Sequence, residues 1–286
     1  SERLRAHVQS VLAVDGEVPA FEVDVIVDTA VLRILQLAAE RRVDLIVWPE
    51  TSLTTPLEDH PRLERHLIEA VAAWHIPLLL GAVGRSEQAG GTRYRNGALV
   101  IEPGGTPRRV IDKAIGVPWI ETVPTDDRIR QLLGRWGWQA SARSLEAAGF
   151  DDPPGASVDA TVAICYEVAF SGIFDRRRSE STNSLIVLAS DDWGVGTAML
   201  DIQVAHARFR AIEQRLPVLR VAHGDGTLHI DELGRTQASL NPRKPGALVV
   251  DVRAGRAPTV AEHLAFLSLP ACAGALGWVV ARRLWR

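Results

Sequence analysis

The sequence predicts an α/β domain in which mixed β-sheets are covered by helices. Compact apolar runs of strand length alternate along the chain with longer stretches whose apolar residues recur at helical spacing. The turn residues in "EPGGTP" join two strand-like runs into a hairpin, which adds an antiparallel pair. With 286 residues and 47% hydrophobic content, the chain can fill the sizeable core that such a domain needs.

The first half of the chain contains two stretches that are expected to be helical. Apolar residues recur at helical spacing over 21–42, and "PRLERHLIEAVAAW" at 61–74 is a second amphipathic helix. Compact apolar runs around these stretches are typical of buried strands. The strands expected in this half lie at 4–13, 43–48 and 76–84 and in the hairpin 96–113.

The second half repeats this rhythm after a long stretch without a clear pattern. Residues 125–157, which include "GRWGWQ" and "DDPPGA", are expected to form a loop, a lid or an insertion. The stretch 199–215 is expected to be helical. The strands expected in this half lie at 156–167, 183–190, 216–236 and 246–252.

Composition and charge argue against two classes of function. The formal net charge is -3 and the sequence pI is about 6.2, so the chain lacks the basic surface that nucleic-acid binding needs. The two cysteines, Cys165 and Cys272, lie in segments of very different character. Neither a disulfide framework nor a cysteine zinc site is therefore supported.

The two ends of the chain favour a piece of a larger membrane protein. The chain begins at Ser1 and its only methionine is Met199, which is expected of a fragment or a processed product. Residues 264–281 carry no charge and precede an arginine cluster. As a helix they would rise about 27 Å, enough to cross a thin hydrocarbon core; a buried C-terminal helix or hairpin is the alternative. If they span, the positive-inside rule places Arg286 in the cytoplasm and the large domain outside.

Three of the expected strands end in a residue with reactive chemistry. Glu50 follows "DLIVWP", Lys113 follows "RRVID", and Cys165 follows "VAI". Loops at strand ends of α/β proteins carry polar groups into a crevice, so these side chains could form one site. A carboxylate can take the thiol proton, and an ammonium can lower the thiol pKa and stabilise an oxyanion. Taken singly, each residue also has a structural interpretation: Glu50 as an acid in a turn, Lys113 as a surface lysine and Cys165 as a buried core residue.

Three motifs in this order, "WPET", "IDK...VPWIETVP" and "ICYE", make the chain resemble the nitrilase (carbon-nitrogen hydrolase) superfamily. The resemblance covers most of 4–252 and, with "ALVIEPGG" and "HARFRAIEQRLPVLRVA", points to the apolipoprotein N-acyltransferase branch. It implies a nitrilase-like four-layer αββα sandwich with a C-terminal transmembrane helix. It also implies that Glu50, Lys113 and Cys165 form a catalytic triad.

The same resemblance implies supporting residues around the triad. Glu121, in the lysine-containing loop, matches a further glutamate of the family. Tyr166 and Glu167 match the pair that follows the family's cysteine. Tryptophans in expected loops either pack locally or dip into the bilayer interface and help to admit a lipid chain. These tryptophans are Trp136, Trp138 and Trp193.

The resemblance also implies how the chain is organised. Residues 1–255 would form the catalytic domain, 256–263 a connector and 264–281 the transmembrane helix, with further membrane helices ahead of Ser1 missing from this chain. Members of this branch act at the bacterial inner membrane. The catalytic domain would therefore lie on the periplasmic or outer face of that membrane.

The implied activity is a two-step acyl transfer. Cys165 would take a fatty acyl group from a phospholipid as a thioester, and the N-terminal amine of a diacylglyceryl-cysteine on an apolipoprotein would then attack it. The expected partners are the phospholipid donor, the apolipoprotein acceptor and the membrane, without cofactor, metal or nucleic acid. The alternatives are a nitrilase-family amidase that hydrolyses a small amide with the same triad, and an inactive binding module that carries the triad.

The chain departs from the family pattern at three places close to the expected crevice. "RNGAL", with Asn96 and Gly97, stands where the family often has "YNSAL", and "SDDWGVG" stands for "SNDAWFG", with Asp191 in place of asparagine. "AHGDG" stands for the family's "TNNG". Candidate metal ligands in and after this last segment, for which turn and surface roles are expected, are His223, Asp225 and His229.

Overall fold

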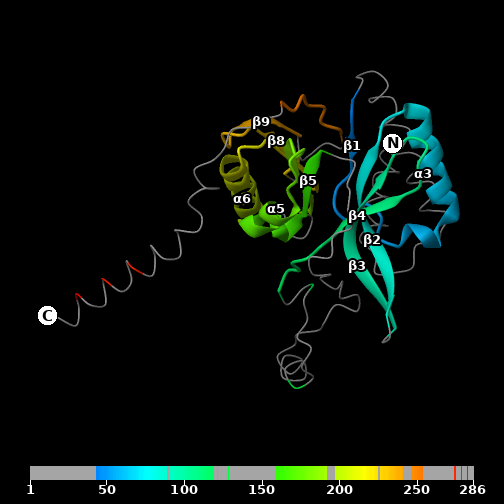
Figure 1. The fold of residues 1–286 in the computed structure, drawn as a ribbon, viewed down its shortest axis with the longest axis horizontal. Coiled ribbons are helices and arrows are strands. Elements are labelled where there is room, and N and C mark those ends of the chain that lie inside the picture. The colour runs from blue at the N-terminus through cyan, green and yellow to red at the C-terminus, as the bar shows by residue number, and fades with distance from the viewer. Residues whose placement is uncertain are drawn as a thin grey trace.

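The computed structural model contains two β-sheets that lie face to face and are covered on their outer sides by helices (Figure 1). The layers run from α3 (Pro61–Trp74) through the first and the second sheet to α5 (Ser171–Arg177) and α6 (Met199–Gln214). Within the described part of the chain, this arrangement confirms the predicted nitrilase-like sandwich. The described residues are 43–88, 91–118, 121, 128, 159–191, 197–224, 226–240, 246–253, 274, 278 and 282.

The first sheet has the strand order β1-β2-β3-β4 within the described residues. β1 (Ile46–Val47) pairs in parallel with β2 (Leu78–Gln88), and the other pairs are antiparallel. β3 (Gly91–Ile101) and β4 (Arg108–Asp112) form the hairpin that "EPGGTP" predicts. Because the end of β4 pairs with the middle of β3, the residue after β4, Lys113, lies beside Asn96 of β3.

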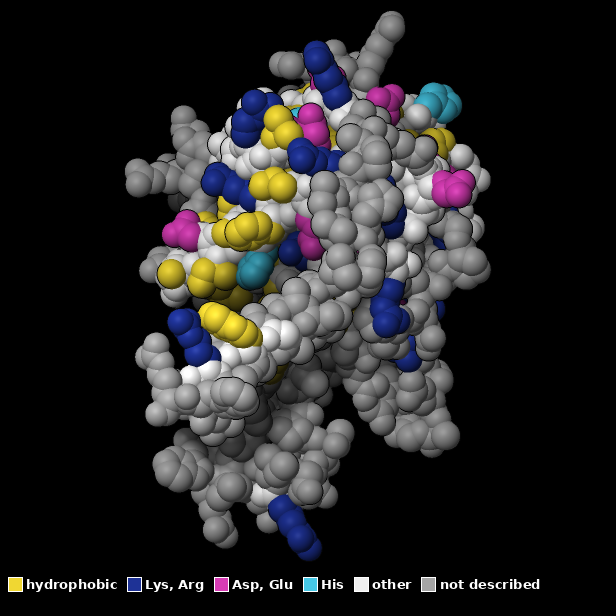
Figure 2. All heavy atoms as spheres, turned by 60° about the vertical axis from the view of Figure 1, so that its left-hand side comes forward, with side chains coloured by type: hydrophobic (Ala, Val, Ile, Leu, Met, Phe, Trp, Pro, Cys, Tyr) yellow, Lys and Arg dark blue, Asp and Glu magenta, His cyan; other side chains and the backbone are white. Residues whose placement is uncertain are grey.

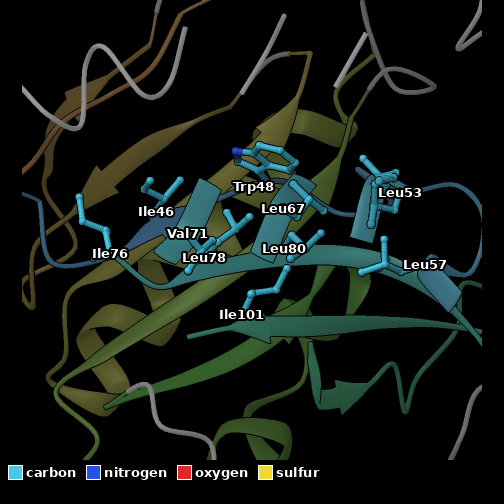
Figure 3. Close-up of a cluster of buried hydrophobic side chains, with 12 residues drawn as sticks. Ile46, Trp48, Leu53, Leu57, Leu67, Val71, Ile76, Leu78, Leu80 and Ile101 are labelled. Carbon is cyan, nitrogen blue, oxygen red and sulfur yellow. The ribbon is translucent and has the colours of Figure 1, made fainter. Parts of the chain in front are cut away.

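Helix α3 covers the outer face of the first sheet with one apolar stripe. Pro61 occupies its first turn, where the missing backbone N–H costs no hydrogen bond. Its fully buried side chains, spaced four residues apart and therefore on one face, are Leu63, Leu67 and Val71. Figure 3 shows Leu67 and Val71 beside Leu78 and Leu80 of β2, with which they form one hydrophobic cluster.

The second sheet has the strand order β5-β6-β7-β8-β9 among the described residues. β5, β6 and β7 are parallel to one another, and β8 and β9 continue the sheet as antiparallel strands. The bounds of these strands are Ala160–Ile164, Ser184–Ser190, Val218–His223, Leu228–Ile230 and Thr236–Ser239. The parallel strands end at the same edge, so the residues after β5 and β6 lie side by side.

The two sheets share a core, and β6 contributes to both sides of it. Leu185 and Val187 pack toward α5 and α6, whereas Ile186 and Leu188 belong to the cluster between the sheets, which includes Leu79 of β2. A strand that is buried on both faces has no place for polar side chains. This explains why "SLIVLAS" shows a continuous apolar run instead of an alternating pattern.

Helix α6 packs on the second sheet mainly through small side chains. Ala207 and Ala211 are fully buried, whereas Phe209 is 61% and Ile202 56% exposed on its outer side. Figure 2 brings the α6 side of the molecule forward and shows hydrophobic side chains among basic and acidic ones. Small buried residues let α6 approach closely, and it contacts η2 (Cys165–Ala169), the short 3-10 helix that carries the candidate nucleophile.

The expected strand at 246–252 is not present. These residues have no regular secondary structure, and Val249 is exposed. Apolar alternation produces a strand only where a neighbour offers backbone hydrogen bonds, and within the described residues β9 is the last strand of this sheet. The expected strand at 4–13, the expected helix at 21–42 and nearly all of 125–157 lie outside the described residues.

The segment 264–281, which was predicted to span a membrane, is described only at Gly274 and Trp278. Among the residues that the structure describes, no helix is both long and apolar enough to cross a membrane. Trp278 is exposed, and the Arg282 guanidinium carbon lies 5.1 Å from the centre of its ring. The membrane span stays a prediction.

Replacing Gly81 should loosen the loop that carries Glu50. A Cβ atom at Gly81 would lie 2.4 Å from the Pro49 carbonyl oxygen and 2.5 Å from the Glu50 Cα atom, so Gly81→Ala should lower the unfolding free energy by about 1–3 kcal/mol. Gly84, in the same strand, has nothing within 4 Å of such an atom. Urea denaturation should therefore find Gly84→Ala as stable as the wild type, and equal losses for both variants would contradict this packing.

Candidate active site

The structure brings Glu50, Lys113 and Cys165 together where the ends of strands from both sheets meet. Glu50 follows β1 and Lys113 follows β4 in the first sheet, whereas Cys165 follows β5 in the second. Their exposed fractions are 4%, 2% and 3%, respectively. Lys113 is therefore not a surface lysine, and Glu50 is not a solvent-facing turn acid. Nucleophilic chemistry requires an acid, an amine and a thiol to lie close together in this way.

Lys113 is the electrostatic centre of the site. Its Nζ atom donates to Glu50 Oε1 at 3.0 Å and to Glu121 Oε1 at 2.7 Å. Burial by itself lowers the pKa of Lys113, but the charges of Glu50, Cys165 and Glu121 outweigh it and raise the pKa above its ordinary value. The ammonium therefore keeps its charge throughout the pH range in which proteins work, and a charge of this kind can stabilise an oxyanion.

Glu50 is held from the neighbouring strand by Asn96. The Asn96 Nδ2 atom donates to Glu50 Oε1 at 2.6 Å, and the Asn96 carbonyl accepts from the Lys113 backbone N–H at 2.8 Å. Asn96 is 2% exposed, and its Oδ1 atom has no hydrogen-bond partner among the described residues. One β3 residue thus fixes both members of the Glu50–Lys113 ion pair. The sequence showed it only as part of "RNGAL".

Cys165 is placed by an unusual backbone conformation. Its φ angle is +49°, in the left-handed region that non-glycine residues rarely adopt, and such outliers gather at functional sites. The conformation turns the chain from β5 directly into η2. As a result, the thiol lies within the electrostatic influence of both Glu50 and Lys113.

The environment of Cys165 favours the neutral thiol. Burial has the largest effect and raises the pKa of Cys165, and the negative charges of Glu50 and Glu121 raise it further. The positive charge of Lys113 and a hydrogen bond from the Ser190 backbone lower it. The resulting pKa is about 12. Lys113 thus lowers the thiol pKa as predicted, but burial first, and then the two carboxylates, raise the pKa by more. A nucleophilic role for Cys165 would therefore require the thiol to lose its proton as it attacks.

The supporting residues occupy different positions around this centre. Glu121 binds the Lys113 ammonium through one oxygen and accepts from the Val117 backbone N–H at 2.8 Å through the other. Tyr166 packs edge-on against Phe170, with ring centres 5.2 Å apart. Their roles in substrate binding stay predictions. The predicted tryptophans Trp136, Trp138 and Trp193 lie outside the described residues.

Glu167 is fully buried, and its carboxylate contacts backbone N–H groups and an arginine. Its carboxylate accepts from the backbone N–H groups of Ala114 at 2.6 Å and Ile164 at 2.8 Å. It also forms an ion pair with Arg177, whose Nη1 atom lies 2.8 Å from Glu167 Oε2. Arg177 was not predicted, because the run "DRRRSE" is typical of a solvated surface.

The departure at Asp191 is accommodated by a buried arginine of β7. Arg220 donates to Asp191 Oδ2 at 2.6 Å through Nη1 and to Asp191 Oδ1 at 2.8 Å through Nη2. Such a bidentate pair neutralises the charge that aspartate brings to the end of β6. At the departure in β3, a Cβ atom on Gly97 would lie 2.9 Å from the Ile111 carbonyl oxygen, so the close approach of β4 favours glycine there.

The candidate metal ligands do not form a metal site in the part of the chain that is described. No group of three or more His, Cys, Asp or Glu side chains there is placed to hold a metal ion, and Asp225 lies outside it. His229 lines an open hollow of about 600 Å³ together with Pro217, which precedes β7. Because β5 and β7 run in parallel, this hollow lies at the opposite end of the sheet from Cys165.

Substitutions on either side of the thiol should move its pKa in opposite directions. A neighbouring carboxylate disfavours a second negative charge, so Glu50→Gln should lower the pKa of Cys165 from about 12, and Lys113→Met should raise it. The ultraviolet absorbance of the thiolate, measured against pH and corrected with Cys165→Ala, reports this titration, and circular dichroism confirms folding at each pH. A pKa that is unchanged or higher in Glu50→Gln would contradict the described charge arrangement.

Comparison with known proteins places this geometry in a family. The carbon-nitrogen hydrolase family matches residues 17–261. Curated relatives include apolipoprotein N-acyltransferases of Allorhizobium ampelinum, 30% identical over 218 residues, and Sinorhizobium medicae, 30% identical over 234 residues. The matches cover 73% and 78% of this chain but 40% and 42% of the relatives. The chain thus spans about two fifths of the length of these relatives.

Solved structures with a similar fold include amidases. One is a mutant of the Nesterenkonia sp. AN1 amidase, in which acrylamide is bound by Michael addition at the active-site cysteine. Its structure matches this chain with a TM-score of 0.57 at 16% sequence identity, and the match covers 82% of this chain and 88% of the amidase chain. The C. elegans NitFhit protein has a TM-score of 0.53 at 16% identity, covering 78% and 54%. These likenesses concern the fold alone. Because the family match covers residues 17–261, most of the chain, the chain belongs to the carbon-nitrogen hydrolase family.

Proposed function

We propose that the chain is the catalytic domain of an apolipoprotein N-acyltransferase that works through a thioester on Cys165. The observation that carries the proposal is the buried Lys113 ammonium, bound to Glu50 and Glu121 beside a neutral thiol. This cluster suits acyl-transfer chemistry. The names of the curated relatives support N-acyl transfer to an apolipoprotein as the reaction.

In the first half-reaction, Cys165 attacks the acyl carbonyl of a phospholipid. Glu50 takes the thiol proton as the Sγ–C bond forms, and the carbonyl electrons move onto oxygen, where the Lys113 ammonium stabilises them. The bond from the acyl carbon to the glycerol oxygen then breaks, and Glu50 returns its proton to the leaving lysophospholipid. The acyl group remains on Cys165 as a thioester.

In the second half-reaction, the amine of a diacylglyceryl-cysteine attacks the thioester. Lys113 again stabilises the oxyanion, and Glu50 takes a proton from the attacking nitrogen. The C–S bond breaks, sulfur recovers the proton from Glu50, and an amide forms on the acceptor. No step requires a cofactor, because each proton moves between Glu50 and a reacting atom.

The proposed substrates belong to a membrane, so we also propose where the domain works. A helix over 264–281 would hold it at the bacterial inner membrane, with the catalytic domain on the periplasmic or outer face. The apolar sequence of this segment and the arginines after it support the proposal. Trp136, Trp138 and Trp193, which the sequence predicts to lie in loops, would then help to admit a lipid chain from the bilayer interface.

The fate of the acyl group separates transfer from hydrolysis. With phospholipid alone, intact mass should show a long-lived adduct on the chain, heavier by one fatty acyl group, and a diacylglyceryl-cysteine peptide should discharge it onto its own amine. A transferase has to exclude water from the thioester while it waits for the acceptor.

Cys165→Ala is the matched control, because it removes the nucleophile and leaves little cavity at a strand end. It should form no adduct under the same conditions. If the wild type forms no adduct from phospholipid but hydrolyses small amides steadily, the chain is an amidase and the acyltransferase proposal is wrong.

A further inference from the structure

A buried ion pair joins η2, which carries the candidate nucleophile, to the end of α5. The side chains of Glu167 and Arg177 are 0% and 4% exposed, and their second contact joins Arg177 Nη2 to Glu167 Oε1 at 3.3 Å. Glu167 lies in η2, two residues after Cys165, and Arg177 ends α5. Neither group takes part in the proton transfers of the proposed reaction.

The pair binds the main chain on both sides of Lys113. Before it, the Asp112 carbonyl accepts from Arg177 Nη2 at 2.9 Å. After it, the backbone N–H groups of Ala114 and Ile115 donate to Glu167 Oε1 at 2.6 and 3.3 Å. The backbone on either side of Lys113 is thus held by three hydrogen bonds to two side chains, one from η2 and one from α5.

The same pair binds the main chain that leads to Cys165. The Val162 carbonyl of β5 accepts from Arg177 Nη1 at 3.1 Å, and the Ile164 backbone N–H donates to Glu167 Oε2 at 2.8 Å. Since Lys113 follows a strand of the first sheet and Cys165 follows a strand of the second, the pair links the two halves of the site.

We propose that Arg177 is a positioning residue, which acts with Glu167 to set the distance between the Lys113 ammonium and the Cys165 sulfur across the two sheets. The inference rests on the proposed function only in that it needs Cys165 to be the nucleophile. It extends that function by naming the residues that hold the Lys113 ammonium and the Cys165 sulfur at the required distance.

Arginine suits this position for a geometric reason. Its planar guanidinium presents five N–H donors in a fixed fork, and here that fork serves a carboxylate and two carbonyls at once. A lysine has a single ammonium and cannot hold all of these acceptors in one geometry. Displacement of a catalytic group by about 1 Å can cost roughly a hundredfold in rate.

A pre-steady-state burst experiment, with the ester in excess over the protein, tests this role without lipid or amine acceptor. The probe is p-nitrophenyl acetate, whose acetyl group passes to Cys165 as p-nitrophenolate leaves. The initial burst of p-nitrophenolate gives the acylation rate constant from its time course and the fraction of reactive sites from its amplitude. Arg177→Lys should lower the rate constant roughly tenfold to a hundredfold while the burst amplitude stays complete. Arg178→Lys is the matched control, because Arg178 donates to Gln214 at 3.2 Å, and it should react at the wild-type rate.

The two burst parameters separate positioning from folding. A smaller amplitude with an unchanged rate constant would mean that Arg177 only stabilises the fold, and it would overturn the proposal, as would an equal loss in Arg178→Lys. If Arg177→Lys loses the native circular dichroism spectrum, Glu167→Asp replaces it, since the shorter carboxylate cannot reach the N–H groups on both sides. A slower complete burst supports the proposal, and an unchanged rate overturns it.

The outcome is also distinguishable from failure of the proposed function. A wild-type chain that reacts with the ester but never acylates the peptide amine contradicts N-acyl transfer, while the Arg177→Lys rate still decides the positioning role. A wild-type chain that shows no burst at Cys165 overturns both.

Discussion

The buried ammonium of Lys113 is the charge around which the rest of the site is arranged. A buried ion without a partner costs several kcal/mol, so Lys113 is stable only because Glu50 and Glu121 both bind it. Burial raises the pKa of the Cys165 thiol, and the negative charge that these carboxylates bring close to it raises the pKa further, to about 12. The site therefore holds a neutral thiol, and in the proposed reaction its sulfur becomes reactive only as its proton leaves.

This chemistry depends on strands from two sheets meeting at the correct distance. The first sheet supplies the acid and the amine, the second supplies the thiol, and the apolar core between them sets only an approximate spacing. Directional contacts refine it: Asn96 ties Glu50 to the Lys113 backbone, and Glu167 with Arg177 joins the main chain beside Lys113 to that beside Cys165. The fold thus places the groups, and buried hydrogen bonds orient them.

The sequence predicts the parts of this structure that depend on local pattern. Helix 61–74 has its predicted bounds because a proline start and an apolar stripe fix it, and the strand ends that carry Glu50, Lys113 and Cys165 follow from short apolar runs. The remainder depends on contacts between distant segments. Arg177 lies in a charged run that normally faces solvent, and the pKa of the thiol depends on how burial balances three nearby charges.

The central claim is that Glu50 accepts the proton of Cys165, and the acylation rate of Glu50→Gln with phospholipid tests it most directly. Glutamine removes the charge that opposes ionisation, so a site limited by thiolate formation alone would react faster in this variant. Our account predicts the reverse: without the base, acylation of Cys165 should slow roughly a hundredfold to ten-thousandfold. Acylation of Glu50→Gln at the wild-type rate or faster would contradict the account.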